Sequence, residues 1–289
     1  MSDQAHQTAP SIPTHTLNDG TTLPGIGFGT LVRGDNKSER GIMVRSLRSA
    51  ISRGYRLLDT ALSYGNEAEV GQAVRASEVD REDLLITTKV PGRFHGYRGA
   101  KESLRVSLES LGFDYVDLAL IHWPLPRLDL YVDTWRALIE MREEGLIRSI
   151  GVSNFTAEHL RRLHEETGVM PAVNQIEMHP YFPQAQLRAV HDQLGIVTQA
   201  WSPLGRASTL REESVLTEIA DAHGVTPGQV VLRWHLQHGV IPLPASSNPQ
   251  RQHDNLSLDF DLTGDDMLRI DALEQGRIWG QDPDVHEEY

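Results

Sequence analysis

The chain has 289 residues, no cysteine and a formal net charge of −13 at pH 7. The length fits a single α/β barrel of about 250 residues, and the lack of cysteine excludes disulfides and thiolate chemistry. The acidic balance argues against a nucleic-acid surface, which needs basic clusters, and no apolar run approaches the ~18 residues that span a bilayer, so we expect no membrane partner.

The N-terminal segment MSDQAHQTAPSIP is polar and lacks the basic and apolar regions of a secretory signal. We therefore expect residues 1–13 to be a mobile tail and the protein to be cytoplasmic. The next segment carries Asn18-Asp19-Gly20 between THTL and TTL. Because these residues tolerate the positive φ of a tight turn, the pattern predicts a β-hairpin.

Short apolar segments that end at polar residues then recur along the chain, as expected for buried strands. There are eight: GIGFG (25–29), YRLLD (55–59), LLITTKV (84–90), YVDLALIH (115–122), LIRSIGVS (146–153), AVNQIE (172–177), IVTQA (196–200) and VIPLP (240–244). The spaced glycines of the first segment do not complete GxGxxG, since Thr30 stands at the third position, so we attribute them to tight packing.

Amphipathic segments between these strands begin at capping residues and stop at glycine. The expected starts are Ser38, Asn66, Asp129, Thr156 and Thr226-Pro227. Two further helices are expected in residues 213–224 and 264–276. The alternation predicts a (β/α)₈ barrel spanning residues 14–289 as one domain, with an N-terminal hairpin and two extra helices.

Four polar residues stand where three consecutive strands end or in the loop that follows. They are Asp59, Tyr64, Lys89 and His122. Barrel active sites form at the C-terminal ends of the strands, and a lysine ammonium near a tyrosine lowers the pKa of the phenol. Any one of these residues alone is an ordinary strand-end polar group, but the set together suggests a proton donor for a carbonyl oxygen, held and oriented by its neighbours.

These residues lie in strings that resemble the aldo-keto reductase family over nearly the whole chain: GYRLLDTALSYGNEAEVG, TTKV, LIHWP and GLIRSIGVSNF. The resemblance implies a reductase in which Tyr64 is the proton donor, while Asp59, Lys89 and His122 tune and orient it. It also implies hydride transfer from a nicotinamide dinucleotide to the substrate carbonyl carbon. We expect no metal, because the histidines include no HExxH pair.

The resemblance also implies which residues bind the cofactor. Trp201 matches the ring that stacks on the nicotinamide, and Ala245 stands where the family often has a lysine facing the 2′-phosphate. We therefore expect NADPH to be preferred over NADH, more weakly than in a typical member, with Arg251 as the remaining cation. The full expected set is Thr30, Asp59, Ser153, Asn154, Gln175, Trp201, Ser202, Leu204, Gly205, Ser246, Arg251 and Asn255.

The substrate pocket is expected to be apolar, with aromatic walls. Its expected residues are Phe28, Leu31, Phe94, Trp123 and Trp279, together with His122 of the catalytic set. The strings GLIRSIGVSNF and GRIWGQDPDVHEEY are most similar to bacterial members that reduce keto sugars such as 2,5-diketogluconate, while methylglyoxal, aromatic aldehydes and keto esters are equally admissible.

Two other functions stay open at this point. One is a non-catalytic NADP(H)-binding interaction subunit with the same fold, and the other is a barrel lyase or isomerase that uses no nicotinamide. The intact set of four polar residues argues against the first. Family habit suggests a monomer that acts on a small carbonyl substrate.

Overall fold

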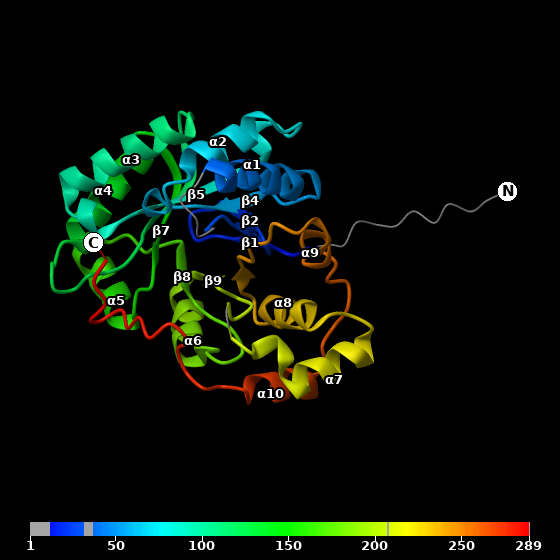
Figure 1. Cartoon of the computed structure of the whole chain (residues 1–289). Helices are drawn as coiled ribbons and strands as arrows, with labels where there is room; N and C mark the ends of the chain where they lie inside the picture. The colour runs from blue at the N-terminus through cyan, green and yellow to red at the C-terminus, as the bar shows by residue number, and fades with distance from the viewer. Residues whose placement is uncertain (1–11, 32–36, 207, 289) are drawn as a thin grey trace.

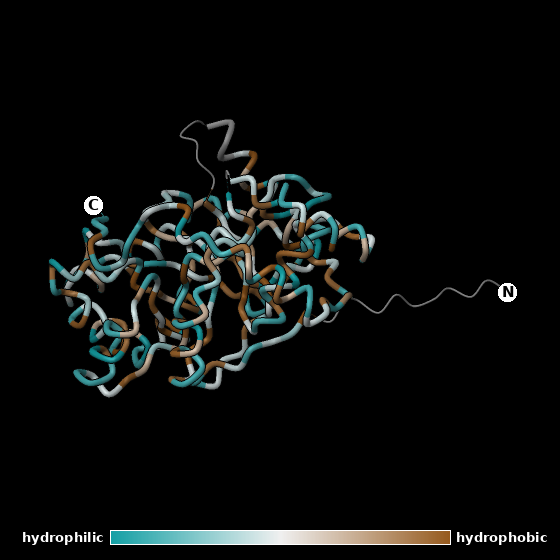
Figure 2. Tube along the Cα trace, turned by 90° about the horizontal axis from the view of Figure 1, so that it is seen from below, coloured by the Kyte–Doolittle hydropathy of each residue, from teal (hydrophilic) through white to brown (hydrophobic). Residues whose placement is uncertain are grey.

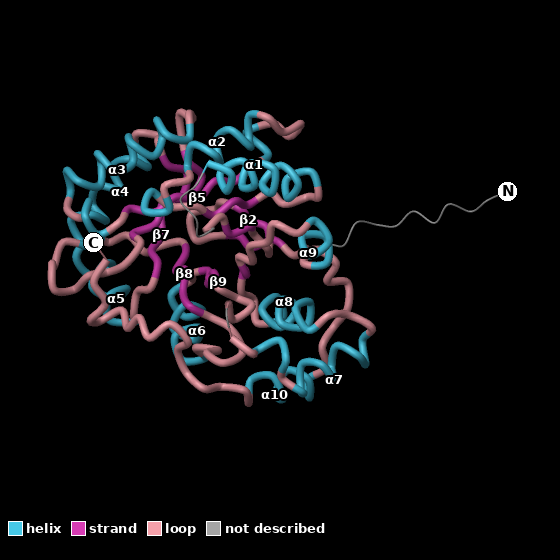
Figure 3. The backbone as a smooth tube through the Cα atoms, viewed as in Figure 1, coloured by secondary structure: helices cyan, strands magenta, loops and turns pink. Residues whose placement is uncertain are grey.

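The computed structural model describes residues 12–31, 37–206 and 208–288, so the tail expected over residues 1–13 lies almost entirely outside it. Eight parallel strands curl through the centre of the molecule and helices surround them (Figures 1 and 3). In sheet order they are β10 (Ile241–Pro242), β9 (Val197–Trp201), β8 (Val173–Glu177), β7 (Ile147–Ser153), β6 (Val116–Ile121), β5 (Leu85–Val90), β4 (Leu57–Asp59) and β3 (Phe28–Gly29).

Helices connect successive strands on the outside of this sheet (Figure 1), which is consistent with the predicted (β/α)₈ barrel. None of the helices in the described ranges is long and apolar enough to cross a membrane. The helices are α1 (Lys37–Ser52), α2 (Glu67–Arg75), α3 (Tyr97–Leu111), α4 (Tyr131–Glu143), α5 (Ala157–Thr167), α6 (Ala185–Leu194), α7 (Ser214–His223), α8 (Pro227–Gln237), α9 (Pro249–Asp254) and α10 (Gly264–Asp271).

The two edges of the curled sheet, β3 and β10, are not paired as a ladder, so the predicted barrel is not closed by strand pairing. Pro242 and Pro244 face this seam and have no N–H to donate. Their carbonyls instead accept hydrogen bonds from the N–H groups of Gly27 (3.0 Å) and Gly29 (3.1 Å). A Cβ on Gly27 would lie 2.5 Å from the Leu243 side chain, so these glycines serve close packing across the seam.

The predicted hairpin is confirmed: β1 (Thr14–Thr16) pairs antiparallel with β2 (Thr22–Pro24). Its buried Leu17 and Leu23 pack with the side chains that fill the inside of the curled sheet. Ser149 of β7 donates a hydrogen bond to the Asp19 carboxylate of the hairpin (2.7 Å), and its hydroxyl lies 2.8 Å from the Thr21 hydroxyl. The hairpin therefore covers the end of the sheet at which the strands begin.

Side chains alternate between the two faces of each strand, and this alternation positions the polar residues. On β6, Leu118 and Leu120 belong to the inner cluster, while Ala119 and Ile121 pack outward against the helices. Hydrophobic segments accordingly alternate with hydrophilic ones along the chain, and much of the hydrophilic chain lies at the periphery (Figure 2). The last inward-facing residue of each strand, such as Asp59 on β4 and Lys89 on β5, therefore lies at the same C-terminal end of the curled sheet.

Several helix starts differ from those predicted. Asn66 occupies the N-cap of α2, but its side chain donates to the backbone of Thr30 (2.9 Å) and accepts from Thr60 (2.6 Å) instead of capping. Asp129 binds Arg162, and α4 begins after Leu130. Ser38 lies one residue inside α1, and its side chain is outside the described part.

The caps predicted at Thr156 and Thr226 are confirmed, each as a capping box that includes the third helical residue. The two extra helices are present as α7 and α10.

Buried His235 of α8 is expected to make the fold sensitive to acid. Burial lowers its pKa to about 3, although the carbonyls of Val231 and Met178 partly oppose this. The unfolded chain takes up the proton near the ordinary histidine value of about 6.5, so stability is full above that pH and is lost as pH falls below it. The expected loss from this residue at pH 5 is about 2 kcal/mol.

Urea unfolding of wild type and His235→Gln at pH 7.5 and pH 5 measures this effect. We expect the pH difference to shrink in His235→Gln and to persist in the matched control His164→Gln, since His164 is exposed on α5. Equal pH slopes for wild type and His235→Gln would remove His235 as the cause.

Candidate active site

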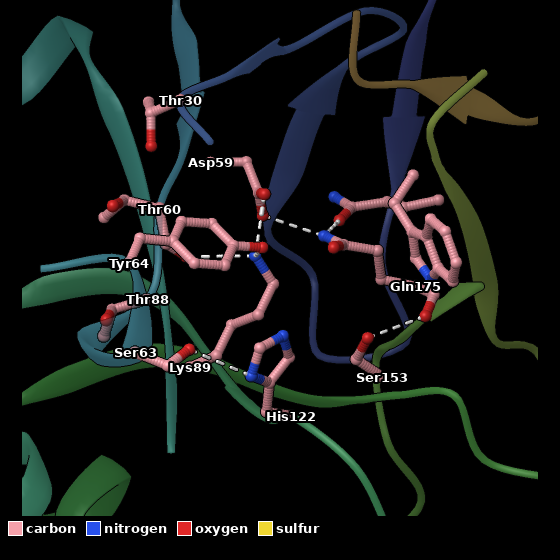
Figure 4. A network of polar contacts seen from close by, with 12 residues as sticks. Thr30, Asp59, Thr60, Ser63, Tyr64, Thr88, Lys89, His122, Ser153 and Gln175 are labelled. Atoms are coloured by element: carbon pink, nitrogen blue, oxygen red, sulfur yellow. Dashed lines mark hydrogen bonds and ion pairs between the residues drawn. The ribbon is translucent and has the colours of Figure 1, made fainter. Parts of the chain in front are cut away.

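The four polar residues predicted from the sequence meet at the C-terminal mouth of the sheet (Figure 4). Asp59 ends β4, Lys89 lies in β5, and His122 directly follows β6, and these three strands are adjacent. Tyr64 ends a short 3₁₀ turn, Leu62–Tyr64, which returns the chain from β4 toward α2. The phase of the strands therefore brings residues 63 positions apart in the sequence to one place.

Lys89 is fully buried, and its ammonium has three partners. It donates to the Asp59 carboxylate at 2.7 Å, to the Thr60 carbonyl at 3.0 Å and to the Tyr64 hydroxyl at 3.4 Å. Burial lowers the pKa of Lys89, but Asp59 and Tyr64 more than offset this, so the pKa lies above its ordinary value. The amine therefore stays charged beside the phenol.

The Tyr64 hydroxyl is buried, and two opposing effects act on it. Burial raises its pKa and is the larger influence, whereas the Lys89 ammonium lowers it, so the net pKa is above the ordinary value. The expected lowering by Lys89 is thus present but outweighed by burial. A phenol in this setting keeps its proton at neutral pH, as a proton donor must.

His122 lies beside Tyr64, with ring centroids 5.9 Å apart and planes inclined by 72°. Its Nδ1 is 2.6 Å from the Glu288 carboxylate and 3.3 Å from the Ser63 hydroxyl. A carboxylate at that distance takes a hydrogen bond from a protonated Nδ1. In a neutral ring, Nε2 then accepts hydrogen bonds, and in the imidazolium it donates them.

A second polar cluster lies on the next strands of the sheet. Gln175 donates to Asp59 (2.8 Å) and to Gln199 (3.0 Å). Ser153 donates to the Gln175 carbonyl (2.9 Å), and Asn154 donates to the His122 carbonyl (3.1 Å). Asn154 adopts a left-handed backbone, φ 64°, which asparagine tolerates.

Trp201, at the end of β9, joins this cluster because its indole N–H donates to the Asn154 side chain at 2.8 Å. The indole is thereby fixed at the edge of the mouth. Together the cluster presents amide and hydroxyl groups on one side and an aromatic ring on another, which suits a planar ligand with a carboxamide.

Both clusters line one cavity of about 970 Å³. It runs from His122 and Trp123 to α9, where Arg251 and the C-cap residue Asn255 lie. The predicted residues that line it are Phe28, Thr30, Leu31, Asp59, Tyr64, His122, Trp123, Ser153, Asn154, Gln175, Trp201, Ser202, Leu204, Ser246, Arg251, Asn255 and Trp279.

Three predicted residues do not line the cavity. Lys89 lies behind Tyr64 and Asp59 and acts through them. Gly205 turns the loop after β9 with φ 57° and packs against Leu210, and Phe94 sits outside the lining in a 3₁₀ turn, Gly92–Phe94.

Sequence reasoning missed Gln281, His286 and Glu288, which line the cavity from the C-terminal segment. Glu177, fully buried at the end of β8, holds this segment by accepting from the N–H groups of Ile278 (2.8 Å) and Trp279 (3.4 Å). From the sequence, this segment was expected at the pocket only through Trp279. The segment is irregular and polar and carries no periodicity, so no local pattern indicated which of its other residues reach the mouth.

Comparison with known proteins agrees with this geometry. The model of the family described as "Aldo/keto reductase family" matches residues 25–275. The chain is 55% identical over 281 residues to 2,5-diketo-D-gluconic acid reductase B of Corynebacterium sp. (strain SHS752001), covering 96% of this chain and 99% of that protein.

Solved structures agree as well. An aldo/keto reductase from Brucella melitensis superposes with a TM-score of 0.86 at 44% identity, covering 91% of this chain and 100% of that chain. An aldo-keto reductase of Bombyx mori in complex with NADP superposes with a TM-score of 0.83 at 35% identity, covering 91% of this chain and 92% of that chain. The resemblance seen in the sequence is confirmed, and the chain belongs to the aldo/keto reductase family of NAD(P)H-dependent oxidoreductases.

Proposed function

We propose that the protein is an NADPH-dependent reductase that converts small aldehydes and ketones to alcohols, with Tyr64 as the proton donor. One observation carries the proposal. The Tyr64 hydroxyl lies 3.4 Å from the Lys89 ammonium and beside the His122 ring, at one end of a cavity whose other end holds Arg251. Keto sugars, methylglyoxal and similar small carbonyl compounds are the substrates to test first.

The donor set of the cavity fits a nicotinamide dinucleotide. Ser153, Asn154 and Gln175 offer hydroxyl and amide groups for the carboxamide, and Trp201 offers a ring to stack on. Arg251 and Asn255 stand at the far end for the adenosine part, and Ser202, with φ 50°, turns the loop between them. When bound, the reduced nicotinamide supplies the hydride for the carbonyl carbon.

The protein's own part is to bind the carbonyl group and to provide its proton. The Tyr64 hydroxyl donates a proton to the carbonyl oxygen as negative charge develops there, and the Lys89 ammonium stabilises the phenolate that remains. Asp59 keeps Lys89 charged and in place at 2.7 Å. Nε2 of His122 has no hydrogen-bond partner among the described residues. In the imidazolium that pairs with Glu288 through Nδ1, Nε2 donates a hydrogen bond to the reacting oxygen and orients it.

Cofactor preference is expected to depend on Arg251. With Ala245 in place of a lysine, Arg251 is the cation proposed to bind the 2′-phosphate, and one charge-assisted contact is worth about tenfold to a hundredfold in affinity. We expect Arg251→Ala to raise the Kd for NADPH by that factor and to leave the Kd for NADH nearly unchanged. Quenching of the intrinsic tryptophan fluorescence by each cofactor measures both Kd values. An equal loss of affinity for the two cofactors, or a wild-type protein that binds NADH as tightly as NADPH, contradicts the assignment.

The experiment that tests the function is consumption of NADPH and NADH against a panel of carbonyl compounds. Turnover supports the reductase and excludes the non-catalytic subunit. Binding of NADPH without turnover of any carbonyl would favour that subunit, and absence of any cofactor quench would favour a lyase or isomerase. The monomeric state, the cytoplasmic location and the single domain remain predictions for light scattering, fractionation and limited proteolysis.

A further inference from the structure

The C-terminal segment after α10 returns to the mouth of the cavity and is held there at several points. It runs from α10 past α6 toward α5 (Figure 1), where Asp284 lies 3.6 Å from His159. Near the end of the segment, His286 packs on Trp123 with ring centroids 4.2 Å apart. These contacts bring Glu288, the last residue that the structure describes, to the reacting end of the cavity.

Glu288 has a fitted position against the ring of His122. One carboxylate oxygen lies 2.6 Å from His122 Nδ1, and the other accepts a hydrogen bond from the Gly92 N–H at 3.1 Å. A Cβ on Gly92 would lie 2.4 Å from the Glu288 carbonyl oxygen, so the two backbones can approach this closely only because residue 92 is glycine. The side chain and the backbone of Glu288 are therefore both held beside the ring.

The Glu288 carboxylate is ionised at neutral pH. Burial raises its pKa, but the hydrogen bond and the charge of His122, together with the Gly92 N–H, outweigh burial, so the net pKa lies below the ordinary value. An ionised carboxylate accepts hydrogen bonds and donates none. With the two groups 2.6 Å apart, Nδ1 of His122 must therefore carry a proton.

This requirement leaves two protonation states for the His122 ring. Figure 4 shows Nδ1 on the side of Ser63 and the other ring nitrogen on the side of the Tyr64 hydroxyl. In the neutral ring protonated at Nδ1, Nε2 presents a lone pair, which repels the lone pairs of a carbonyl oxygen; in the imidazolium, Nε2 donates a hydrogen bond to it. The other neutral tautomer, protonated at Nε2 alone, would place a lone pair of Nδ1 against the Glu288 carboxylate. Glu288 thus excludes the one neutral form of the ring that could bind a carbonyl oxygen.

The other titratable groups around the ring keep their charge near neutral pH. Burial lowers the pKa of His95 to about 4 and also lowers the pKa of His286, so both rings are neutral at pH 7 and above. Burial raises the pKa of Tyr64, which keeps its proton, and the raised pKa of Lys89 keeps the ammonium charged. Among the described residues at this end of the cavity, His122 is therefore the group whose protonation can control carbonyl binding.

We propose, on the basis of the function proposed above, that Glu288 is a positioning residue that couples binding of the substrate carbonyl group to protonation of His122. Since the carbonyl oxygen binds to the imidazolium, each bound substrate requires one proton on the ring. Once the pH is high enough to remove that proton from the enzyme without substrate, KM rises about tenfold per pH unit. The value of kcat does not follow, because it reports the enzyme–substrate complex, in which the bound carbonyl oxygen retains the proton on Nε2.

The test uses Glu288→Gln, whose amide can donate a hydrogen bond to Nδ1 as well as accept one from it. The ring can then carry its single proton on Nε2 and bind a carbonyl oxygen while neutral. Nitrogen NMR of the imidazole rings follows the pH at which His122 loses one proton, and the His122 signals are identified by their absence in His122→Gln.

The KM for benzaldehyde, which is uncharged and does not titrate, is then measured below that pH and two pH units above it. We expect KM to rise about a hundredfold in the wild type. In Glu288→Gln we expect a rise of about fivefold or less, the difference between a charged and a neutral hydrogen-bond donor. The kcat of each protein is expected to change by no more than about twofold over the same interval.

The same spectra test the tautomer without any turnover. Above the pH at which His122 loses its proton, we expect the remaining proton on Nδ1 in the wild type and at least partly on Nε2 in Glu288→Gln. Glu287→Gln is the matched control, because Glu287 does not line the cavity and its carboxylate pairs with Arg127 at 3.2 Å. We expect this control to match the wild type in both measurements.

Three results would overturn the inference and leave the reductase function standing. They are a neutral wild-type ring protonated at Nε2, an equal change of KM in the wild type and Glu288→Gln, and a Glu287→Gln variant that behaves like Glu288→Gln. Failure of the wild type to reduce benzaldehyde or any other carbonyl compound would overturn the proposed function, and the coupling with it, while the spectra would still decide the tautomer.

Discussion

We expect Tyr64→Phe to lower kcat for carbonyl reduction by about 10²–10⁴-fold, the usual contribution of a positioned general acid. The change removes the phenolic proton and keeps the ring. Lys89 retains Asp59 at 2.7 Å and Thr60 at 3.0 Å, so no buried charge is left unpaired and the fold should hold. The Kd for NADPH is expected to stay within about twofold, because the lost interaction is made in the transition state.

Steady-state kinetics with a good carbonyl substrate and a fluorescence titration with NADPH measure the two effects. Tyr97→Phe is the matched control, since Tyr97 is 41% exposed on α3 and does not line the cavity. Activity of Tyr64→Phe close to that of wild type would mean that the proton comes from another group. A parallel loss of cofactor binding would assign Tyr64 a role in binding.

Much of the fold could be predicted because its signals are local. All eight predicted strands are present, and the hairpin around Asn18-Asp19-Gly20 forms as expected. Helices α3, α6 and α9 were not predicted. The Thr226-Pro227 start has a strong cap signal, whereas α3 follows Gly96, which has no capping side chain, and α6 follows Gln184 in a left-handed conformation.

The misread caps have a different cause. Asn66 and Asp129 are good capping residues, but each finds a tertiary partner: Asn66 binds Thr30 and Thr60, and Asp129 binds Arg162. The contacts of Asn66 with Thr30 and of Asp129 with Arg162 join residues more than 30 positions apart, and such contacts cannot be read from local sequence. The lack of a strand ladder between β3 and β10 could be anticipated only in part. Pro242 and Pro244 are visible in the sequence, but the sequence does not show that they face β3.

The site follows the same division. Asp59, Lys89 and His122 share one strand phase and three successive strands, so their meeting was predictable once parallel strands were assumed. Glu288 and its contact with His122 depend on how the last segment folds back, which Glu177 and Gly92 determine from distant parts of the chain. The net direction of the Tyr64 pKa shift could not be predicted from the sequence either, because burial raises this pKa by more than the Lys89 charge lowers it.

Lys89→Met is expected to damage both stability and catalysis. Lys89 is fully buried and Asp59 is only 5% exposed, so the substitution leaves a buried carboxylate without its cation. Removal of one partner from a buried ion pair costs about 3–5 kcal/mol. Chemical denaturation of the variant measures this loss. Lys101→Met is the control, because Lys101 pairs with partly exposed Glu140 and Glu144 and should cost about 1 kcal/mol or less.

The sign of the pH effect follows from the same contact. The Lys89 ammonium lowers the pKa of Tyr64, so its removal lets burial raise that pKa further. Reduction requires the protonated phenol and fails as pH rises through its pKa, so the basic limb of the reduction profile should move to higher pH in Lys89→Met. Alcohol oxidation requires the phenolate, and its rise with pH should move in the same direction. A reduction profile that keeps its shape and position in a folded Lys89→Met variant would remove Lys89 from the tuning role, because no other described cation contacts the Tyr64 hydroxyl.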